Sequence, residues 1–151
     1  IRNAFKEAGV IFVILPNLPG SGINGATKKL GQNVMLMVND RRFYSDTFWF
    51  TLFHEIGHII NGDYGITFEN EHDGKEDSAD KYAEDKLIPP GEYEAFVEMD
   101  QFSESAIRRF AERINRDPGI VLGRLQNDQI VSFSNVALSK ALKHKYKVIT
   151  A

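Results

Sequence analysis

The segment His54-Glu55-Ile56-Gly57-His58 holds two imidazoles four residues apart, with a carboxylate between them. Residues at this spacing share one face of a helix, with Cβ atoms roughly 5–6 Å apart, so both imidazoles can reach a single metal ion. Glu55 can then reach a water molecule held by that ion. A random chain of this average composition would contain about 0.0075 copies of the pattern, so a chance match is rare. The segment therefore predicts one zinc ion (Zn2+) with His54 and His58 as ligands and Glu55 as the general base.

A long helix is predicted around these residues, over 47–60, with Asp46 as its N-cap and Asn61-Gly62 at its end. The apolar side chains on nearly all sides of this helix are Phe48, Trp49, Phe50, Leu52, Phe53, Ile56, Ile59 and Ile60. A helix that is apolar all round is buried, and polar groups buried with it need partners. This pattern favours a metal site over two histidines on a solvated helix face.

A third protein ligand is needed, because catalytic zinc normally takes three such ligands and a water molecule. A metzincin would supply glycine and histidine three and six residues after the second histidine, where this chain has Asn61 and Tyr64. That class is therefore excluded. The candidates in the acidic segment that follows are Glu69, Glu71, His72, Asp73, Glu76, Asp77 and Asp80.

Glu76 is the strongest of these candidates, because it opens a helix predicted over 76–87. Ala79 and Ala83 form a stripe of small residues on that helix, and Gly57 offers a matching gap on the histidine helix. Small residues let two helices approach closely, so a carboxylate beside the stripe would lie over the metal. The spacing predicts Glu76 as the third ligand. The alternative is that Glu76 only stabilises the positive N-terminal end of its helix.

Two further side chains have predicted or alternative roles near the metal. Asp80, one turn after Glu76, is predicted to accept a hydrogen bond from the free nitrogen of a zinc-bound histidine. His72 is the main rival for the third ligand position, since imidazole is the stronger ligand type. It lies in a loop with no helical frame, and its alternative interpretation is a solvent-exposed histidine.

These groups predict hydrolysis of a peptide bond, because a zinc-activated water and a neighbouring general base are the parts that this reaction needs. A side-chain donor would help to stabilise the tetrahedral oxyanion. The candidate donors are Tyr44, Tyr64, Tyr82 and Tyr93. A strand predicted over 34–38 either pairs with the substrate backbone or is internal with no free edge, and the sequence favours neither alternative.

Composition limits the class of protein. The 151 residues carry 18 basic and 21 acidic side chains, a net charge of −3, which argues against a domain that binds nucleic acid or anionic membranes as a whole. The absence of cysteine excludes disulfides, a thiol nucleophile and cysteine zinc ligands. No apolar run approaches the roughly 20 residues of a membrane span, so we expect no membrane partner. Because the chain begins at Ile1, we expect a fragment of a longer protein whose N-terminal domain is missing.

The predicted architecture is α+β, with residues 1–151 as one domain. A sheet-rich part over 1–45 precedes the zinc-site helices over 46–88 and a C-terminal helical part over 90–147. Strands are predicted over 10–15 and 34–38, with a third around 25–30 and a loop over 16–26. Further helices are predicted over 1–8, ended by a left-handed Gly9, and over 91–99, 103–115, 118–126 and 135–144.

Two motifs, over 48–60 and 76–89, resemble those of the ImmA/IrrE family of zinc metallopeptidases, and Gly25-Ala26-Thr27 adds to the similarity. The resemblance implies a thermolysin-like helical body, with the HExxH helix at its centre and a small N-terminal mixed β-sheet packed on it. It also implies one zinc held by His54, His58 and Glu76, with Glu55 as base. The expected protein is cytoplasmic and cleaves a helix-turn-helix repressor.

The chain most resembles those family members in which the peptidase-like domain is fused behind a repressor-type DNA-binding domain, the HigA-like antitoxins. That resemblance implies a cognate toxin as a possible partner and DNA contact through the missing N-terminal domain. A second hypothesis is therefore a non-hydrolytic regulatory or antitoxin module with the same fold, which controls transcription by binding DNA or a partner through Arg108, Arg109 and Arg113.

Residues 106–125 have the sequence pattern of a helix-turn-helix. The segment 103–126 carries five arginines and three acidic residues. A DNA-reading helix needs polar residues at its start to reach base edges. Pro118, Gly119, Ile120 and Val121 stand there instead. The pattern therefore favours a helical pair that packs against the rest of the domain over one that reads DNA.

Overall fold

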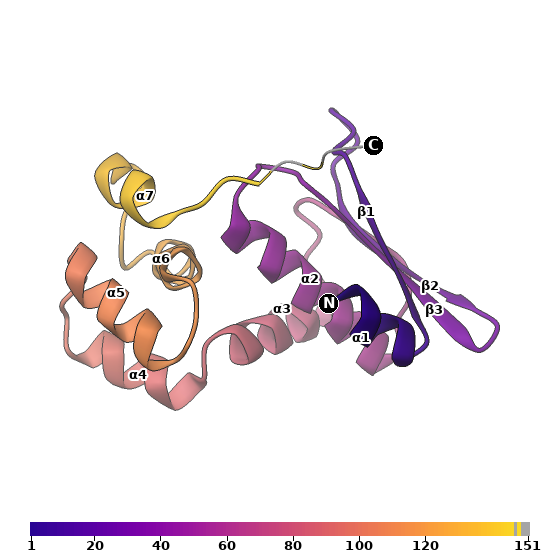
Figure 1. The fold of residues 1–151 in the computed structure, drawn as a ribbon, viewed down its shortest axis with the longest axis horizontal. Coiled ribbons are helices and arrows are strands. Elements are labelled where there is room, and N and C mark those ends of the chain that lie inside the picture. The colour runs from indigo at the N-terminus through magenta and orange to yellow at the C-terminus, as the bar shows by residue number, and fades with distance from the viewer. Residues whose placement is uncertain (147, 149–151) are drawn as a thin grey trace.

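The computed structural model describes residues 1–146 and 148, which form a mixed α+β fold of seven helices and a four-stranded sheet (Figure 1). In chain order the elements are α1 (Arg2–Glu7), β1 (Val10–Leu15), β2 (Ile23–Leu30), β3 (Asn33–Asn39), α2 (Ser45–Asn61), β4 (Ile66–Phe68), α3 (Gly74–Leu87), α4 (Pro90–Glu98), α5 (Glu104–Arg113), α6 (Pro118–Asn127) and α7 (Val136–Leu142). The predicted α+β class is confirmed. Helices α2 and α3 lie between the sheet and helices α4 to α7, while α1 packs beside β1.

The sheet has the strand order β1-β3-β2-β4, with β1 parallel to β3 and the other pairs antiparallel. Because β3 lies between β1 and β2, the hypothesis that residues 34–38 pair with a substrate is wrong, and the alternative of an internal strand is correct. Strand β2 begins at Ile23, inside the loop predicted over 16–26. Strand β4, which forms one edge, was not predicted, since three residues are too few for a periodic pattern.

One face of the sheet packs on α2. Leu36 and Val38 of β3 and Leu52 of α2 are buried together, and partly buried β1 side chains complete this small core. The two β3 residues alternate with side chains on the other face, as the period of a strand requires. This contact fixes the position of α2, and therefore of its histidines, relative to the sheet.

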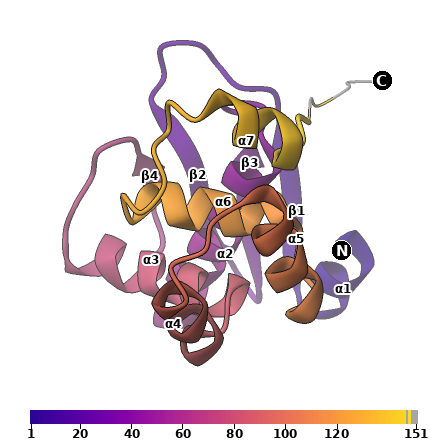
Figure 2. The same cartoon turned by 90° about the vertical axis from the view of Figure 1, so that its left-hand side faces the viewer.

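The helices α4 to α7 enclose a second, larger core, in which α6 is surrounded by α5, α7 and α2 (Figure 2). Val121, Leu122 and Leu125 of α6 are fully buried, and the N-cap Asp117 accepts a hydrogen bond from Gly119 N–H. A helix buried in this way cannot enter a DNA groove. The expectation that residues 106–125 form a packed helical pair is confirmed.

Two helices, α2 and α3, begin two residues before their predicted starts. Helix α2 begins at Ser45 with Tyr44 as N-cap, so the assignment of Asp46 as N-cap is wrong. The carboxylate of Asp46 instead lies 2.9 Å from Nζ of Lys143. Helix α3 begins at Gly74, two residues before the predicted start, because the Asp73 side chain accepts hydrogen bonds from the first free backbone N–H groups.

The end of α2 is as predicted. Gly62 has a left-handed backbone (φ +75°), which favours glycine. Its N–H donates to the carbonyl of Ile59, and the N–H of Asp63 donates to the carbonyl of His58. These are the two hydrogen bonds of a Schellman motif, and they turn the chain back beside the last turn of α2.

None of the helices in the described residues combines the length and the apolar character that crossing a lipid bilayer requires.

Candidate metal centre

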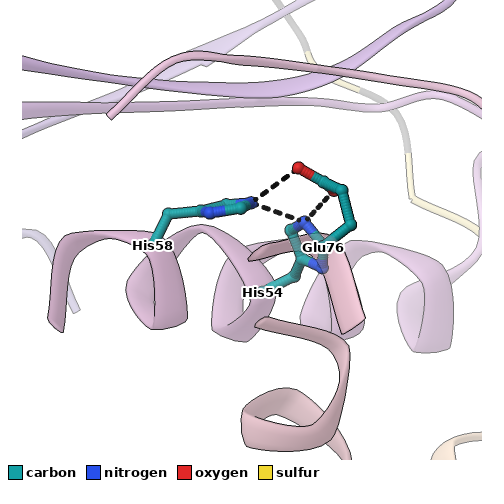
Figure 3. Close-up of side chains that lie close together, drawn as sticks. All are labelled: His54, His58 and Glu76. Atoms are coloured by element: carbon teal, nitrogen blue, oxygen red, sulfur yellow. Dashed lines mark hydrogen bonds and ion pairs between the residues drawn. The ribbon is translucent and has the colours of Figure 1, made fainter. Parts of the chain in front are cut away.

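Three predicted ligand side chains meet between α2 and α3 (Figure 3). Nε2 of His54 lies 3.0 Å from Nε2 of His58 and 3.0 Å from Oε2 of Glu76, and Nε2 of His58 lies 3.2 Å from Oε1 of Glu76. Both imidazoles are buried, and the Glu76 side chain is 13% exposed. One ligand atom from each residue therefore points at a common centre.

The spacing and chemistry of these atoms fit a metal ion. Ligand atoms about 2.0–2.1 Å from a tetrahedral zinc ion lie about 3.3 Å apart, close to the three separations in the protein. Nδ1 of His54 lies 2.7 Å from the Asp80 carboxylate, which accepts a hydrogen bond from that nitrogen and leaves the lone pair of a neutral ring on Nε2. Lone pairs from two imidazoles and a carboxylate repel one another unless a cation or a proton lies between them. The cluster can thus hold one metal ion.

The close approach of α3 to α2 positions Glu76. A Cβ atom built on Gly57 would lie 3.1 Å from the Cα of Ala79, and both Ala79 and Ala83 are fully buried. The predicted contact between the small-residue stripe and the glycine gap is confirmed. Asp73 caps the N-terminus of α3, and Glu76 lies in the first turn of that helix. The cap therefore fixes the backbone from which the Glu76 side chain extends.

Each imidazole has a carboxylate beside its second nitrogen. Asp80 contacts Nδ1 of His54, as the sequence predicts. Oδ1 of Asp63 lies 3.3 Å from Nδ1 of the buried His58, and the Asp63 side chain is only 13% exposed. Sequence reasoning missed Asp63. The signal that could have found it is the left-handed Gly62, because a Schellman turn brings the next residue back beside the last turn of the helix.

Burial lowers the pKa of His54, but the hydrogen bond to Asp80 and the charges of Asp80, Glu55 and Glu76 outweigh it and raise the pKa overall. The imidazole therefore sits in a negative environment. That environment also favours a bound cation.

Glu55 is fully buried, and neither of its carboxylate oxygens makes a hydrogen bond of normal geometry within the described residues. Burial raises its pKa to about 7, and the neighbouring Thr67 side chain and His54 offset part of this rise. A buried carboxylate without a partner is costly, so one that persists is typical of a functional site. Glu55 follows His54 on α2 and is near enough to His54 and Glu76 for their charges to act on its pKa.

A cleft of about 680 Å³ opens onto this cluster and is lined by His54, Glu76 and Asp80. Its walls come from β4, the N-terminal half of α2, α3 and α6. Of the tyrosines proposed as oxyanion donors, Tyr44 is the one that lines this cleft within the described residues. Tyr93 instead donates a hydrogen bond to Asp128 in the helical body.

The rejected ligand candidates have other contacts or lie in solvent. Glu69 pairs with Arg41 and Arg42, Glu71 accepts a hydrogen bond from the N–H of Phe68, and His72 and Asp77 are exposed. The structure thus brings together the cluster that the sequence favours and leaves the alternatives outside it.

A scan against models of protein families finds no match for the chain, and a search of curated proteins also finds none. Membership of the ImmA/IrrE family stays a prediction from the two motifs.

Proposed function

We propose that this protein is a zinc-dependent endopeptidase. The observation that carries the proposal is the meeting of His54, His58 and Glu76 beside Glu55, a buried carboxylate with no hydrogen-bond partner within the described residues. A purely structural metal site would need four protein ligands and no neighbouring base. Three ligands with an adjacent base instead suit a site that leaves one position for water.

Zinc, when bound, supplies a Lewis acid that lowers the pKa of a water molecule to near 7. Glu55 then acts as general base, takes a proton from the attacking water and later gives it to the leaving amine. Burial raises the pKa of Glu55 in the metal-free protein to about 7, and a bound cation would lower it, so the carboxylate would be ionised and able to accept that proton. Asp80 accepts a hydrogen bond from Nδ1 of His54 and so orients that ring, and Asp63 places a second carboxylate 3.3 Å from Nδ1 of His58.

The substrate would be an extended peptide along the cleft. Strand β4 is an edge strand beside the site, and the N–H of Phe68 donates to the Glu71 side chain rather than to a neighbouring strand. An open edge can pair with a peptide backbone, so β4 takes the role first considered for residues 34–38. The apolar residues of the cleft wall include Phe50, Leu87, Ile88, Ile120 and Phe133. This wall suits a large apolar side chain of the substrate.

The wider assignment rests on the motifs. We propose a thermolysin-like packing with α2 at its centre, supported by the contacts of α2 with the sheet, α3 and α6. By the resemblance to the ImmA/IrrE family, the substrate would be a cytoplasmic helix-turn-helix repressor. An N-terminal domain outside this chain would bind DNA, and a cognate toxin would be a partner.

The test combines metal analysis with a peptide library. The zinc-loaded protein is incubated with peptides derived from a bacterial proteome, and new termini are identified by mass spectrometry. We expect about one zinc per chain and a defined set of cleavages, which Glu55→Gln abolishes while it retains the metal. A wild-type protein that binds no zinc, or that binds zinc and cleaves nothing, contradicts the proposal; the second result favours the non-hydrolytic regulatory module.

A further inference from the structure

Strand β2 has an irregularity directly over Glu55. Its pairing with β4 shifts between Ile23, which faces Phe68, and Gly25, which faces Thr67, so Asn24 is an extra residue on β2. An extra residue of this kind is a β-bulge, and bulges are common next to active sites because they re-aim neighbouring side chains. Without the bulge, a different β2 residue would face Thr67.

Gly25 is the residue that the bulge places against the base. A Cβ atom built there would lie 2.3 Å from Oε1 and 2.6 Å from Cδ of Glu55. No side chain larger than hydrogen fits while the Glu55 carboxylate stays in place. Thr67, buried on the opposite strand, contributes to the pKa of the same carboxylate. Glu55 is therefore enclosed by two paired strand residues.

Arg41 holds the bulge from the loop that follows β3. Its Nη1 donates to the carbonyl of Gly22 at 3.2 Å and to Oδ1 of Asn24 at 3.0 Å, and its Nη2 pairs with Glu69 just after β4. One guanidinium thus joins both sides of the irregular pairing. Asn39, buried at the end of β3, adds a hydrogen bond from Nδ2 to the carbonyl of Ile23 at 2.8 Å.

We propose that Arg41 and Gly25 are positioning residues for Glu55. Arg41 fixes the bulge at Asn24, and the bulge presents the backbone of Gly25, without a Cβ atom, to the Glu55 carboxylate. This inference rests on the proposed function for its catalytic consequence, although the position of Glu55 can be tested without any activity.

The first test is Gly25→Ala, with Gly65→Ala as the matched control. Gly65 lies just before β4, and a Cβ atom there would meet no atom within 4 Å. Because the added methyl group would clash with the Glu55 side chain from Cγ outward and with no backbone atom among its nearest neighbours, we expect the side chain to swing away while the fold is retained. Crystal structures of both zinc-loaded variants should show the carboxylate displaced only in Gly25→Ala. An unmoved carboxylate in Gly25→Ala overturns the proposal.

Activity then shows whether this displacement matters. For a peptide cleaved by the wild type, we expect kcat to fall about 100-fold in Gly25→Ala, with zinc affinity and KM within about twofold of the wild type. A uniform loss of zinc affinity or of folded protein would indicate a merely structural role. If the wild type binds zinc without cleaving any peptide, the proposed function fails, and the crystal structures still decide where Gly25 places Glu55.

The second test compares Arg41→Ala with Arg42→Ala. Both arginines pair with Glu69, but within the described residues only Arg41 also contacts Gly22 and Asn24. We expect faster hydrogen exchange in peptides covering 22–26 for Arg41→Ala alone, with a drop in kcat at unchanged zinc affinity. Equal exchange in the two variants would contradict the role given to Arg41.

Discussion

The helical body and the metal-centre region differ in whether their buried polar groups have hydrogen-bond partners. In the body formed by α4 to α7, the core is apolar, and the rings of Phe96 and Phe110 stack with centroids 4.2 Å apart. The N-terminal ends of α5, α6 and α7 are each capped by a side chain that accepts a backbone hydrogen bond. Among the buried side-chain polar atoms of α4 to α7, only Oε1 of Gln126 lacks a hydrogen bond within the described residues.

The metal-centre region instead concentrates polar atoms that lack partners. Of the seven buried side-chain atoms without a hydrogen bond in the described part of the chain, four belong to Glu55, His58 and Asp63. Such groups oppose folding unless something else satisfies them. The difference shows that the body supplies stability, while the region between the sheet and α3 is organised for a ligand and for proton transfer.

The largest effect should come from the body. Phe96→Ala removes a ring that is 1% exposed and stacked on another, so we expect a loss of about 3–5 kcal/mol in the free energy of unfolding. Zinc affinity of the folded protein should not change. Phe133→Ala, at a side chain 68% exposed, is the control and should cost little stability. Chemical denaturation and zinc competition measure the two quantities. If Phe96→Ala weakens zinc binding in folded protein, the separation of roles is wrong.

The next effect concerns the buried base, where we expect a substitution to increase the free energy of unfolding instead of lowering it. The pKa of Glu55 is raised by burial from 4.5 to about 7, so the folded state holds this proton more tightly than the unfolded state. Stability of the metal-free protein should therefore fall as pH rises from about 4.5 through about 7, by about 3 kcal/mol from this group.

Glu55→Gln should remove this pH dependence. The variant should be more stable than the wild type at about pH 8, and the difference should vanish near pH 4.5. His54 is present in both proteins, so its own titration largely cancels. Denaturation curves in the presence of a chelator at several pH values provide the measurement. A variant that is less stable than the wild type at about pH 8 would show that the buried carboxylate is satisfied in the folded protein.

The site was largely predictable because its ligands follow local rules. The spacing of His54 and His58 is a property of one helix, and the stripe of Ala79 and Ala83 indicated which face of α3 meets Gly57. These features need only helical periodicity and the size of side chains. The same rules predicted the packed α6, whose first turn is apolar.

What failed depended on contacts between distant segments. The start of α2 was misassigned because the N–H of Ser45 donates to the carbonyl of His144, a residue of the C-terminal segment. Thr67 lies on a strand of three residues, and its contact with Glu55 exists only through the register of β2 and β4. Local patterning carries no information on such pairings, so the shell around the base could not be derived before the fold was known.

A smaller effect should distinguish the carboxylate beside His58 from an ordinary surface acid. Asp63→Ala leaves Nδ1 of the buried His58 without its neighbour, and we expect zinc affinity to fall about 10-fold. Asp63→Asn should retain most of the affinity, because the amide keeps an oxygen acceptor beside Nδ1 of His58. Asp77→Ala, at an exposed position on α3, should leave affinity unchanged. Equal zinc affinities for Asp63→Ala and Asp77→Ala would remove Asp63 from the centre.

The smallest effect is expected at the arginines of α5, and it tests whether the helical body has a function of its own. Arg108 pairs with Glu104 and Arg113 with Glu92, at side chains about half exposed, so each pair contributes about 0–1 kcal/mol. The triple variant Arg108→Ala/Arg109→Ala/Arg113→Ala should therefore keep zinc affinity, peptide cleavage and binding to duplex DNA within about twofold of the wild type. If this variant instead loses DNA binding that the wild type shows, the body is an interaction module as well as a scaffold. That result would favour the regulatory hypothesis, because α5 would then present a basic DNA-binding surface even though α6 is buried.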